Sequence, residues 1–423
     1  MKSFLDPYAV LFKNILELLP KSLSLQISAT YDYSSFFEKN IADFFKQQPR
    51  VILDEFVQLP GFWFSKIKIV SQGFLIGSFG VAESKHDAVL LSQAEFLERV
   101  SSWIPLDGVR RKNFFIDNAQ TSTKLVVKSI IRFTYKKVKI SDLYWGLAET
   151  KETKRQVTTS GIAGHFIQKN AILNAWLELI ERDSFLVHWL NTISPPKIDI
   201  SCGVRDKELE LLLDSCKKNE IEVHLLDITS DLGVPVCLAI VSKNDKAALG
   251  AKASFSQEWN IKKALLEALV VHASMAGMVA KDLPADFTPF SDERVDKVRR
   301  LESSFSEHGR QAMTFLFSSE KSVAIEPQES CTLSVGEQIA RLKGIFSQRY
   351  SNNRDYDVFV YFFKNKLTHT FNFSVVRVIC DALYPMYLSE HFADPSHPRL
   401  QEFVKNRGLE KIAKLNSFPH PFS

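Results

Sequence analysis

The chain has 423 residues, of which 45% are hydrophobic and 24% charged, and its net charge is +4. This composition is typical of a globular protein and excludes collagen-like and low-complexity chains. A small charge spread over scattered clusters does not indicate nucleic acid binding. The five cysteines include no Cys-x-x-Cys pair, and no apolar run reaches the roughly 20 residues of a membrane span. We therefore expect a cytoplasmic protein without membrane contact.

The N-terminal part of the chain predicts a helical or irregular lead-in over residues 1–60, followed by one large domain over 61–423. The alternation in Trp63–Val70 predicts a strand, and Gly73, Gly77 and Gly80 then predict a turn region. A helix follows over about 84–103.

A second passage repeats this order. Strand-like residues Ser141–Leu147 and the turn Thr158–Gly164 precede a helix over about 169–190. The two passages form a weak internal repeat of strand, glycine-bearing turn and helix, which suggests two equivalent units whose helices meet.

The rest of the chain mixes strands and helices, which predicts an α/β (mixed α+β) fold. We expect strands over 221–228, 234–241, 357–363 and 374–380, a helix from about 260, a variable insertion or linker over about 280–345, and a proline-containing C-terminal tail over 415–423.

The sequence Glu-x-x-Glu-Arg occurs in both predicted helices, as Glu95–Arg99 and as Glu178–Arg182. Residues three apart share a helix face, so each copy would point two carboxylates in one direction. Like charges beside apolar neighbours resist burial, so a cation is expected against them. Two such helices facing each other would suit Mg²⁺. A single pair is more often a solvated helix face, but the duplication favours a metal site.

The second copy lies in a longer motif. Thr159–Ala163, then Ala171–Leu173 and Glu178–Asp183, resemble the second ATP-binding motif of YcaO-domain proteins, in which Ser-Asn-Gly-Leu-Ala precedes a helix ending Glu-Leu-Ile-Glu-Arg-Asp. The first copy resembles that family's first motif, and Lys263 with Glu267 resembles its third. The resemblance covers about residues 65–390.

This resemblance implies a YcaO-like fold that binds ATP through Mg²⁺ ions held by glutamates from several helices. The metal ligands it implies are Glu95, Glu98, Glu178, Glu181 and Glu267. The nucleotide-binding residues it implies are Ser160, Arg182, Lys263 and Arg99. For Arg99, neutralisation of the adjacent glutamates is an equal alternative.

The chain also departs from the family pattern. Lys263 stands where the family has arginine, Leu91 replaces a serine, and Gly80-Val81-Ala82 replaces Gly-Lys-Gly. Azoline-forming members often end in Pro-x-Pro-x-Pro. This chain has Pro419 and Pro421 with Ser423 in the third place, so these three are the candidates for a catalytic tail, and a frayed end is the alternative.

The resemblance implies an ATP-dependent cyclodehydratase that converts Cys, Ser or Thr of a ribosomally made precursor peptide to thiazoline or oxazoline rings. The backbone amide oxygen would be phosphorylated and then eliminated. A leader-binding or E1-like partner protein is expected, with a dehydrogenase as a further candidate, in an oligomer or complex. The alternatives are thioamide or amidine formation by the same fold, and a non-catalytic scaffold in a modification complex.

Overall fold

The computed structural model describes residues 33–45, 50–55, 62–71, 74–103, 123–145, 156–201, 203–275, 278–325, 333–351, 356–409 and 414–422. Parts of the sequence predictions fall outside these ranges: residues 1–32, 46–49 and 56–60 of the lead-in, Gly73, residues 146–147 of a predicted strand, residues 326–332 of the predicted insertion or linker, and Ser423. Within them the fold is mixed α+β, as the sequence predicted. Every helix in the described ranges is too short or too polar to span a bilayer.

The described strands form three sheets. The first is antiparallel with the order β1-β2-β3, the second has the order β10-β9-β8-β7-β11 with a parallel β7–β11 pair, and the third is antiparallel with the order β5-β4-β12-β13-β6. The strands are β1 Arg50–Glu55, β2 Trp63–Ser71, β3 Phe74–Ala82, β4 Lys124–Ser129, β5 Tyr135–Lys139, β6 Ile162–His165, β7 Lys197–Asp199, β8 Glu222–Asp227, β9 Val236–Lys243, β10 Lys246–Ala253, β11 Ser322–Ala324, β12 Val358–Phe363 and β13 Ser374–Cys380.

Helices cover these sheets and connect them. The α-helices are α3 Tyr33–Phe45, α4 Lys85–Ser101, α6 Gln168–Leu190, α7 Lys207–Lys218, α8 Gln257–Ser274, α9 Lys297–Ser304, α10 Glu307–Met313, α11 Val335–Arg349, α12 Lys366–Thr370 and α13 Pro398–Asn406. Short 3₁₀ turns are η1 Ile140–Asp142, η2 Thr314–Phe317 and η3 Glu390–Phe392.

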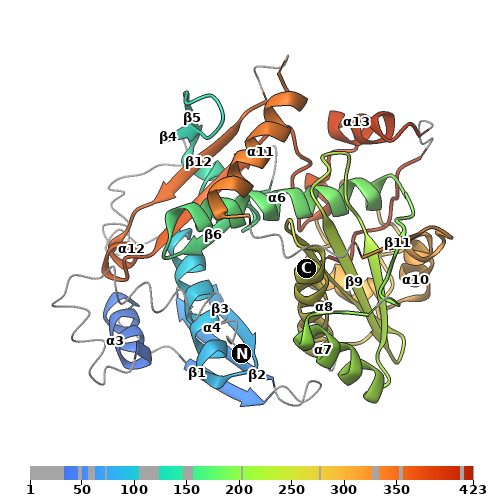
Figure 1. Cartoon of the computed structure of the whole chain (residues 1–423), viewed down its shortest axis with the longest axis horizontal. Coiled ribbons are helices and arrows are strands. Elements are labelled where there is room, and N and C mark those ends of the chain that lie inside the picture. The colour runs from blue at the N-terminus through green and yellow to red at the C-terminus, as the bar shows by residue number, and fades with distance from the viewer. Residues whose placement is uncertain are drawn as a thin grey trace.

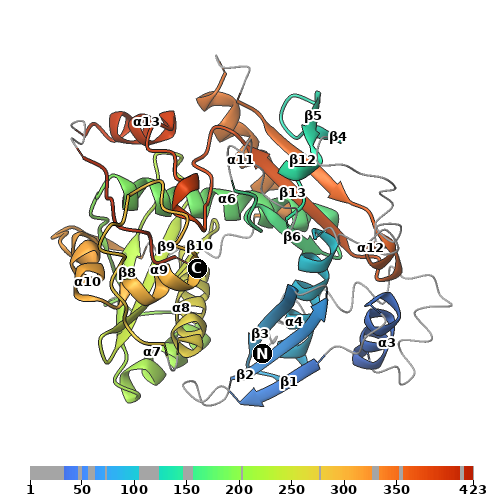
Figure 2. The same cartoon turned by 180° about the vertical axis from the view of Figure 1, so that it is seen from behind.

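Three strand–helix units build the centre of the molecule: β3 with α4, β6 with α6, and β10 with α8. Their strands belong to three different sheets. Helix α6 runs across the molecule between the half that contains α4 and the half that contains α8 (Figures 1 and 2). The repeat inferred from the sequence therefore has a third member, whose strand β10 was not predicted.

Gly77 and Gly80 do not form the predicted turn region, because residues 74–82 are strand β3. Gly80 lies in this strand where α4 packs closest. A Cβ atom at that position would lie 2.3 Å from the carbonyl oxygen of Ala88 and 2.6 Å from the amide nitrogen of Ser92. The glycine therefore serves close packing of strand and helix rather than a turn.

The strand of the second unit also differs from the prediction. Residues 140–142 form η1, and the strand that precedes α6 is β6 (Ile162–His165), within the residues predicted as a turn. The turn itself is shorter and ends at Gly161, whose φ is +77°. A Cβ there would lie 2.7 Å from the carbonyl oxygen of Val378, so only glycine fits.

Two observations bear on the predicted boundaries. The lead-in predicted over 1–60 contains β1, which pairs with β2 in the first sheet. In the segment 280–345, predicted as a variable insertion or linker, β11 pairs with β7, and Arg300 of α9 is 1% exposed. Several polar side chains of this segment are therefore buried.

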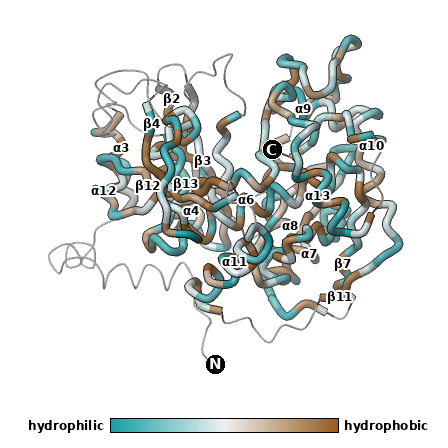
Figure 3. Tube along the Cα trace, turned by 90° about the horizontal axis from the view of Figure 1, so that it is seen from above, coloured by the Kyte–Doolittle hydropathy of each residue, from teal (hydrophilic) through white to brown (hydrophobic). Residues whose placement is uncertain are grey.

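The main hydrophobic core surrounds α6. Trp176, Phe185 and Trp189 of this helix are fully buried, and the Trp176 ring packs 5.2 Å from that of Phe346 on α11. Hydrophobic residues also run along β13 in the view from above (Figure 3). Burial of these large side chains stabilises the helix that carries the second Glu-x-x-Glu-Arg motif.

Candidate functional site

The first Glu-x-x-Glu-Arg motif lies on α4 and faces two strands. Glu95 Oε2 accepts a hydrogen bond from the backbone N–H of Phe79 on β3 at 2.8 Å. Glu98 Oε2 accepts one from the N–H of Gly164 on β6 at 2.7 Å, and thus joins the first unit to the second. A carboxylate of α4 therefore binds the strand that precedes α6, and Glu178 of α6 lies close enough to raise the pKa of Glu98.

The second motif lies in the middle of α6. Glu178 Oε2 accepts a hydrogen bond from the N–H of Gly161 at 3.1 Å. Glu181, which is 2% exposed, accepts one at Oε2 from the N–H of Ala253 on β10, also at 3.1 Å. Helix α6 is thus tied to its own turn and to the strand of the third unit.

Glu267 of α8 completes the pattern. Its Oε2 accepts a hydrogen bond from the N–H of Ala251 on β10 at 3.1 Å. All five predicted carboxylates therefore use one oxygen to bind the backbone of a strand or of the turn before it. This arrangement fixes each side chain and leaves the second oxygen for a cation.

Arg182 lies among three of these second oxygens. Its Nη2 is 3.7 Å from Glu178 Oε1 and 3.9 Å from Glu267 Oε1, and its Nε is 3.6 Å from Glu181 Oε1. We call these four residues the glutamate cluster. The Nε and Nη1 atoms of Arg182 are buried and form no hydrogen bond with the described residues. Buried guanidinium donors that lack a hydrogen bond are suited to phosphate oxygens.

The carboxylates have too little positive charge near them. Burial raises the pKa of Glu98 to about 8, and the neighbouring Glu178 and Glu95 raise it further in the same direction. Burial also raises the pKa of Glu267 to about 7 and that of Glu178 to about 6, although Arg182 opposes the shift in both. A bound cation would favour the ionised forms.

The predicted nucleotide residue Ser160 lies on the turn Thr158–Gly161, directly before the residue whose N–H binds Glu178. Arg377 of β13 holds this turn: its Nη1 donates to the carbonyl oxygens of Thr158 at 3.0 Å and Leu143 at 3.2 Å. Sequence reasoning noted the Arg377 strand but gave the residue no role. An arginine between valines on a predicted strand was the available signal.

Two other predicted residues make contacts outside the glutamate cluster. Arg99 pairs with Glu95 at 2.5 Å and donates to the carbonyl oxygen of Gly77 at 2.7 Å, which fits the neutralising alternative. Lys263 lies one helical turn before Glu267, and its Nζ is 4.5 Å from the centre of the Trp259 ring. Lys252, which the sequence analysis did not single out, lies 3.8 Å from Glu181 Oε2.

The C-terminal segment, residues 414–422, reaches the glutamate cluster. The ring of Phe422 lies 4.2 Å from the guanidinium carbon of Arg182 and 4.8 Å from the ring of Phe185. Pro419 and Pro421 are buried in the same segment. The frayed end considered in the sequence analysis is therefore not what residues 419–422 show.

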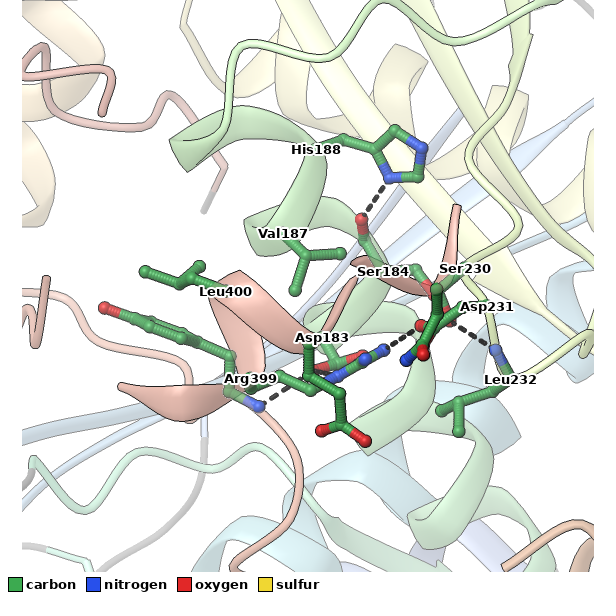
Figure 4. A network of polar contacts seen from close by, with 12 residues as sticks. Asp183, Ser184, Val187, His188, Ser230, Asp231, Leu232, Arg399 and Leu400 are labelled. Carbon is green, nitrogen blue, oxygen red and sulfur yellow. Dashed lines mark hydrogen bonds and ion pairs between the residues drawn. The ribbon is translucent and has the colours of Figure 1, made fainter. Parts of the chain in front are cut away.

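The opposite face of α6 is anchored by a buried ion network (Figure 4). Asp183 and Arg399 are both fully buried, and Arg399 Nη2 lies 2.7 Å from Asp183 Oδ2 and 2.7 Å from Asp231 Oδ1. Asp183 Oδ1 also accepts a hydrogen bond from the N–H of Tyr384 at 2.8 Å. Asp183, the residue after Arg182, thus anchors α6 on this opposite face.

The donor set fits Mg²⁺, because it consists of carboxylate oxygens, and the pKa values of Glu98, Glu178 and Glu267 are raised. In the described part of the chain, no three His, Cys, Asp or Glu side chains converge closely enough to hold a metal ion. The reason is visible in the cluster, where Arg182 lies between Glu178, Glu181 and Glu267. Metal binding would require the free carboxylate oxygens to turn towards one point.

A family model described as YcaO cyclodehydratase, ATP- and Mg²⁺-binding, matches residues 143–383. The matched residues are more than half of the 423 and include the whole glutamate cluster. The chain belongs to the YcaO family. The resemblance seen in the sequence is confirmed, and ATP and Mg²⁺ are the ligands that the family description names. Glu95 and Glu98 lie outside the matched residues.

Solved structures agree on the YcaO fold. A heterocyclase in complex with substrate and cofactor is 15% identical with a TM-score of 0.67, and the match covers 88% of this chain and 54% of that one. YcaO from Methanopyrus kandleri, bound with AMPPCP and Mg²⁺, is 18% identical with a TM-score of 0.56, covering 82% and 88%. A chain of the E. coli microcin synthetase McbBCD complex is 12% identical with a TM-score of 0.55, covering 88% and 96%.

This chain thus spans about half the length of the heterocyclase. A comparison with curated protein sequences found no match.

Proposed function

We propose that this YcaO protein is an ATP- and Mg²⁺-dependent cyclodehydratase that activates backbone amides of a ribosomally made precursor peptide. The observation that carries the proposal is the position of Arg182. Its two unused donors lie among carboxylates from α6 and α8, within the part of the chain that the family model matches. Positive donors beside a carboxylate metal site form a recurring arrangement for phosphoryl transfer.

In this proposal Glu178, Glu181 and Glu267 hold Mg²⁺ through their free oxygens, and Glu95 and Glu98 add further carboxylates from α4. Bound Mg²⁺·ATP supplies the phosphoryl group that turns the amide oxygen into a leaving group. Arg182 binds the transferring phosphate and neutralises its charge. The turn that contains Ser160 faces the nucleotide.

The C-terminal segment supports azoline formation over thioamide or amidine formation. Phe422 lies on Arg182, so this segment borders the phosphate site, and buried Pro419 and Pro421 give it a fixed course. We propose that it closes the site around the reacting amide. Cys, Ser and Thr of the peptide would then be the nucleophiles.

A separate partner protein is proposed to deliver the peptide. One solved relative is an E. coli microcin synthetase complex with pro-MccB17 bound, covering 88% of this chain at a TM-score of 0.55. The described cysteines, Cys216, Cys237 and Cys380, are free and buried, which supports a reducing, cytoplasmic location.

Mass spectrometry of a precursor peptide incubated with the chain, ATP and Mg²⁺ tests the proposal. Cyclodehydration removes one water, about 18 Da, for each ring, whereas a thioamide replaces oxygen by sulfur and adds about 16 Da, with the protein supplying only positioning and charge neutralisation. A gain would move the assignment to thioamide formation. No Mg²⁺-dependent binding of ATP would leave the scaffold role.

A further inference from the structure

We propose that Arg300 is a positioning residue, which holds the C-terminal segment against Arg182. The catalytic consequence of this inference rests on the proposed function, whereas the structural role of Arg300 does not. It concerns α9, a helix in the segment that the sequence analysis treated as a linker.

The first observation is that Arg300 binds the C-terminal segment directly. Its Nη2 donates to the carbonyl oxygen of Phe422 at 2.8 Å, and its Nη1 donates to the carbonyl oxygen of Tyr387 at 2.9 Å. One guanidinium therefore joins three stretches of the chain that are far apart in sequence. In the view from above, the C-terminus lies beside α9 (Figure 3).

The second observation is the environment of Arg300. The residue is 1% exposed, and burial lowers its pKa although the charge of the buried Glu390 opposes this shift. A buried guanidinium is costly unless its donors are satisfied. The hydrogen bonds that offset this cost go to main-chain carbonyls, so they fix the course of the backbone rather than neutralise a charge.

His420 lies beside the same contact. Its Nε2 is 3.0 Å from the carbonyl oxygen of Tyr387 and 3.0 Å from Arg300 Nη1. Burial and the Arg300 charge hold the pKa of His420 well below its usual range, so the ring is neutral. A neutral ring can pack against a buried arginine without repulsion.

The consequence appears at the other end of Phe422. Arg300 fixes the backbone of this residue, and its ring lies over the guanidinium of Arg182. Arg300 thus acts on the phosphate site through one intermediate residue. Lysine can replace it only in part, because a single ammonium lacks the planar fork that reaches two carbonyls at once.

The first test measures hydrogen exchange of the backbone amides of Phe418, His420 and Phe422 in the full-length chain. Arg300→Gln should speed their exchange by roughly tenfold or more, because local opening no longer breaks these bonds. Arg300→Lys should give an intermediate effect. The control is Arg299→Gln, the neighbouring and more exposed residue of α9, which contacts Asp282 and Glu302 instead. Unchanged exchange in both Arg300 variants would overturn the proposal.

The second test uses ATP turnover with precursor peptide. Arg300→Gln should lower kcat about tenfold while KM for ATP changes less than about twofold, since the segment acts in the reacting complex. In a Phe422→Ala background the same substitution should have little further effect, because both changes remove one contact path. Additive losses would show a general structural role and contradict the proposal.

The two tests separate the possible failures. Faster exchange in Arg300→Gln with no turnover in the wild-type chain would reject the proposed function and retain the positioning role. Faster exchange with unchanged kcat would show that the segment is held but has no part in the reaction, and would overturn the catalytic half of the inference.

Discussion

The ring of Phe422 covers the guanidinium of Arg182 at 4.2 Å, although the two residues lie far apart in the sequence. This contact places an aromatic side chain over the only arginine of the glutamate cluster. It leaves two buried guanidinium donors of Arg182 without a hydrogen bond to the described residues. The first prediction concerns those donors.

Arg182→Lys keeps the positive charge but loses the planar fork, so we expect kcat for ATP turnover to fall about 100-fold. Phosphate release measures it. Arg341→Lys is a matched control, because Arg341 also lies over a phenylalanine, Phe255 at 4.9 Å, and is exposed on α11. Wild-type turnover in Arg182→Lys would exclude a phosphate contact.

The double change of Glu178 and Glu181 to Gln should abolish Mg²⁺-dependent ATP consumption. Glutamine keeps an oxygen that can accept from the N–H groups of Gly161 and Ala253, so the fold should persist while the metal ligands are lost. Calorimetric titration with Mg²⁺·AMPPCP and circular dichroism check both parts. Glu210→Gln, on the exposed face of α7, serves as the control.

Stability should depend on pH in a definite direction. Glutamic acids with a pKa above the ordinary 4.5 bind more protons in the folded than in the unfolded chain. Their contribution is complete below pH 4.5 and is lost as the pH rises through the folded values, about 6 for Glu178, about 7 for Glu267 and about 8 for Glu98.

The Tm of the metal-free chain should therefore fall between pH 6 and 8, and Mg²⁺·AMPPCP should raise it most at the upper end. Glu98→Gln should flatten the curve above pH 7. A Tm that rises over this range in the wild-type chain would contradict the burial of these carboxyls.

Arg399→Met should lower the free energy of unfolding by about 3–5 kcal/mol, because it leaves Asp183 buried without its partner. Urea denaturation measures the loss. The comparison is Lys136→Gln, which breaks the exposed pair with Asp381 and should cost less than about 1 kcal/mol. Equal effects of the two changes would show that the buried network does not anchor α6.

Gly161→Ala should weaken Mg²⁺·AMPPCP binding and lower stability. The added Cβ would meet the carbonyl oxygen of Val378 at 2.7 Å and the side chain of Leu179 at 2.8 Å, at a φ of +77°. Gly233→Ala has a similar φ of +68° but no atom within 4 Å of the new Cβ. The difference between the two variants isolates the crowding beside Glu178.

Much of the site could be predicted from sequence because its carboxylates repeat at helical spacing on strongly apolar helices. Glu178 and Glu181 were found in this way, and the structure places both beside Arg182. Strand β10 was missed because Lys246–Ala253 is rich in alanine, lysine and glycine, which have low β propensity. Burial of its central residues, rather than the intrinsic preference of its side chains, makes it a strand.

Other features depend on contacts between distant residues. The polar residues of 280–345 predicted a variable insertion or linker, since nothing local shows that Arg300 bonds to Phe422. The glycines of β3 were predicted to form turns, because the local sequence does not show that Gly80 packs against α4, which lies later in the chain. The preferences of single residues carry no information about these distant partners.

Each of the five predicted carboxylates is bound to a strand or to the turn before it, and β3, β6 and β10 lie in three separate sheets. A ligand that draws these carboxylates to one point must therefore act on all three sheets at once. Nucleotide affinity should then depend on how firmly the three sheets are held relative to one another. A substitution that loosens the packing between the sheets should weaken nucleotide binding, even though it lies outside the site. Ligand binding should in turn reduce movement between the sheets.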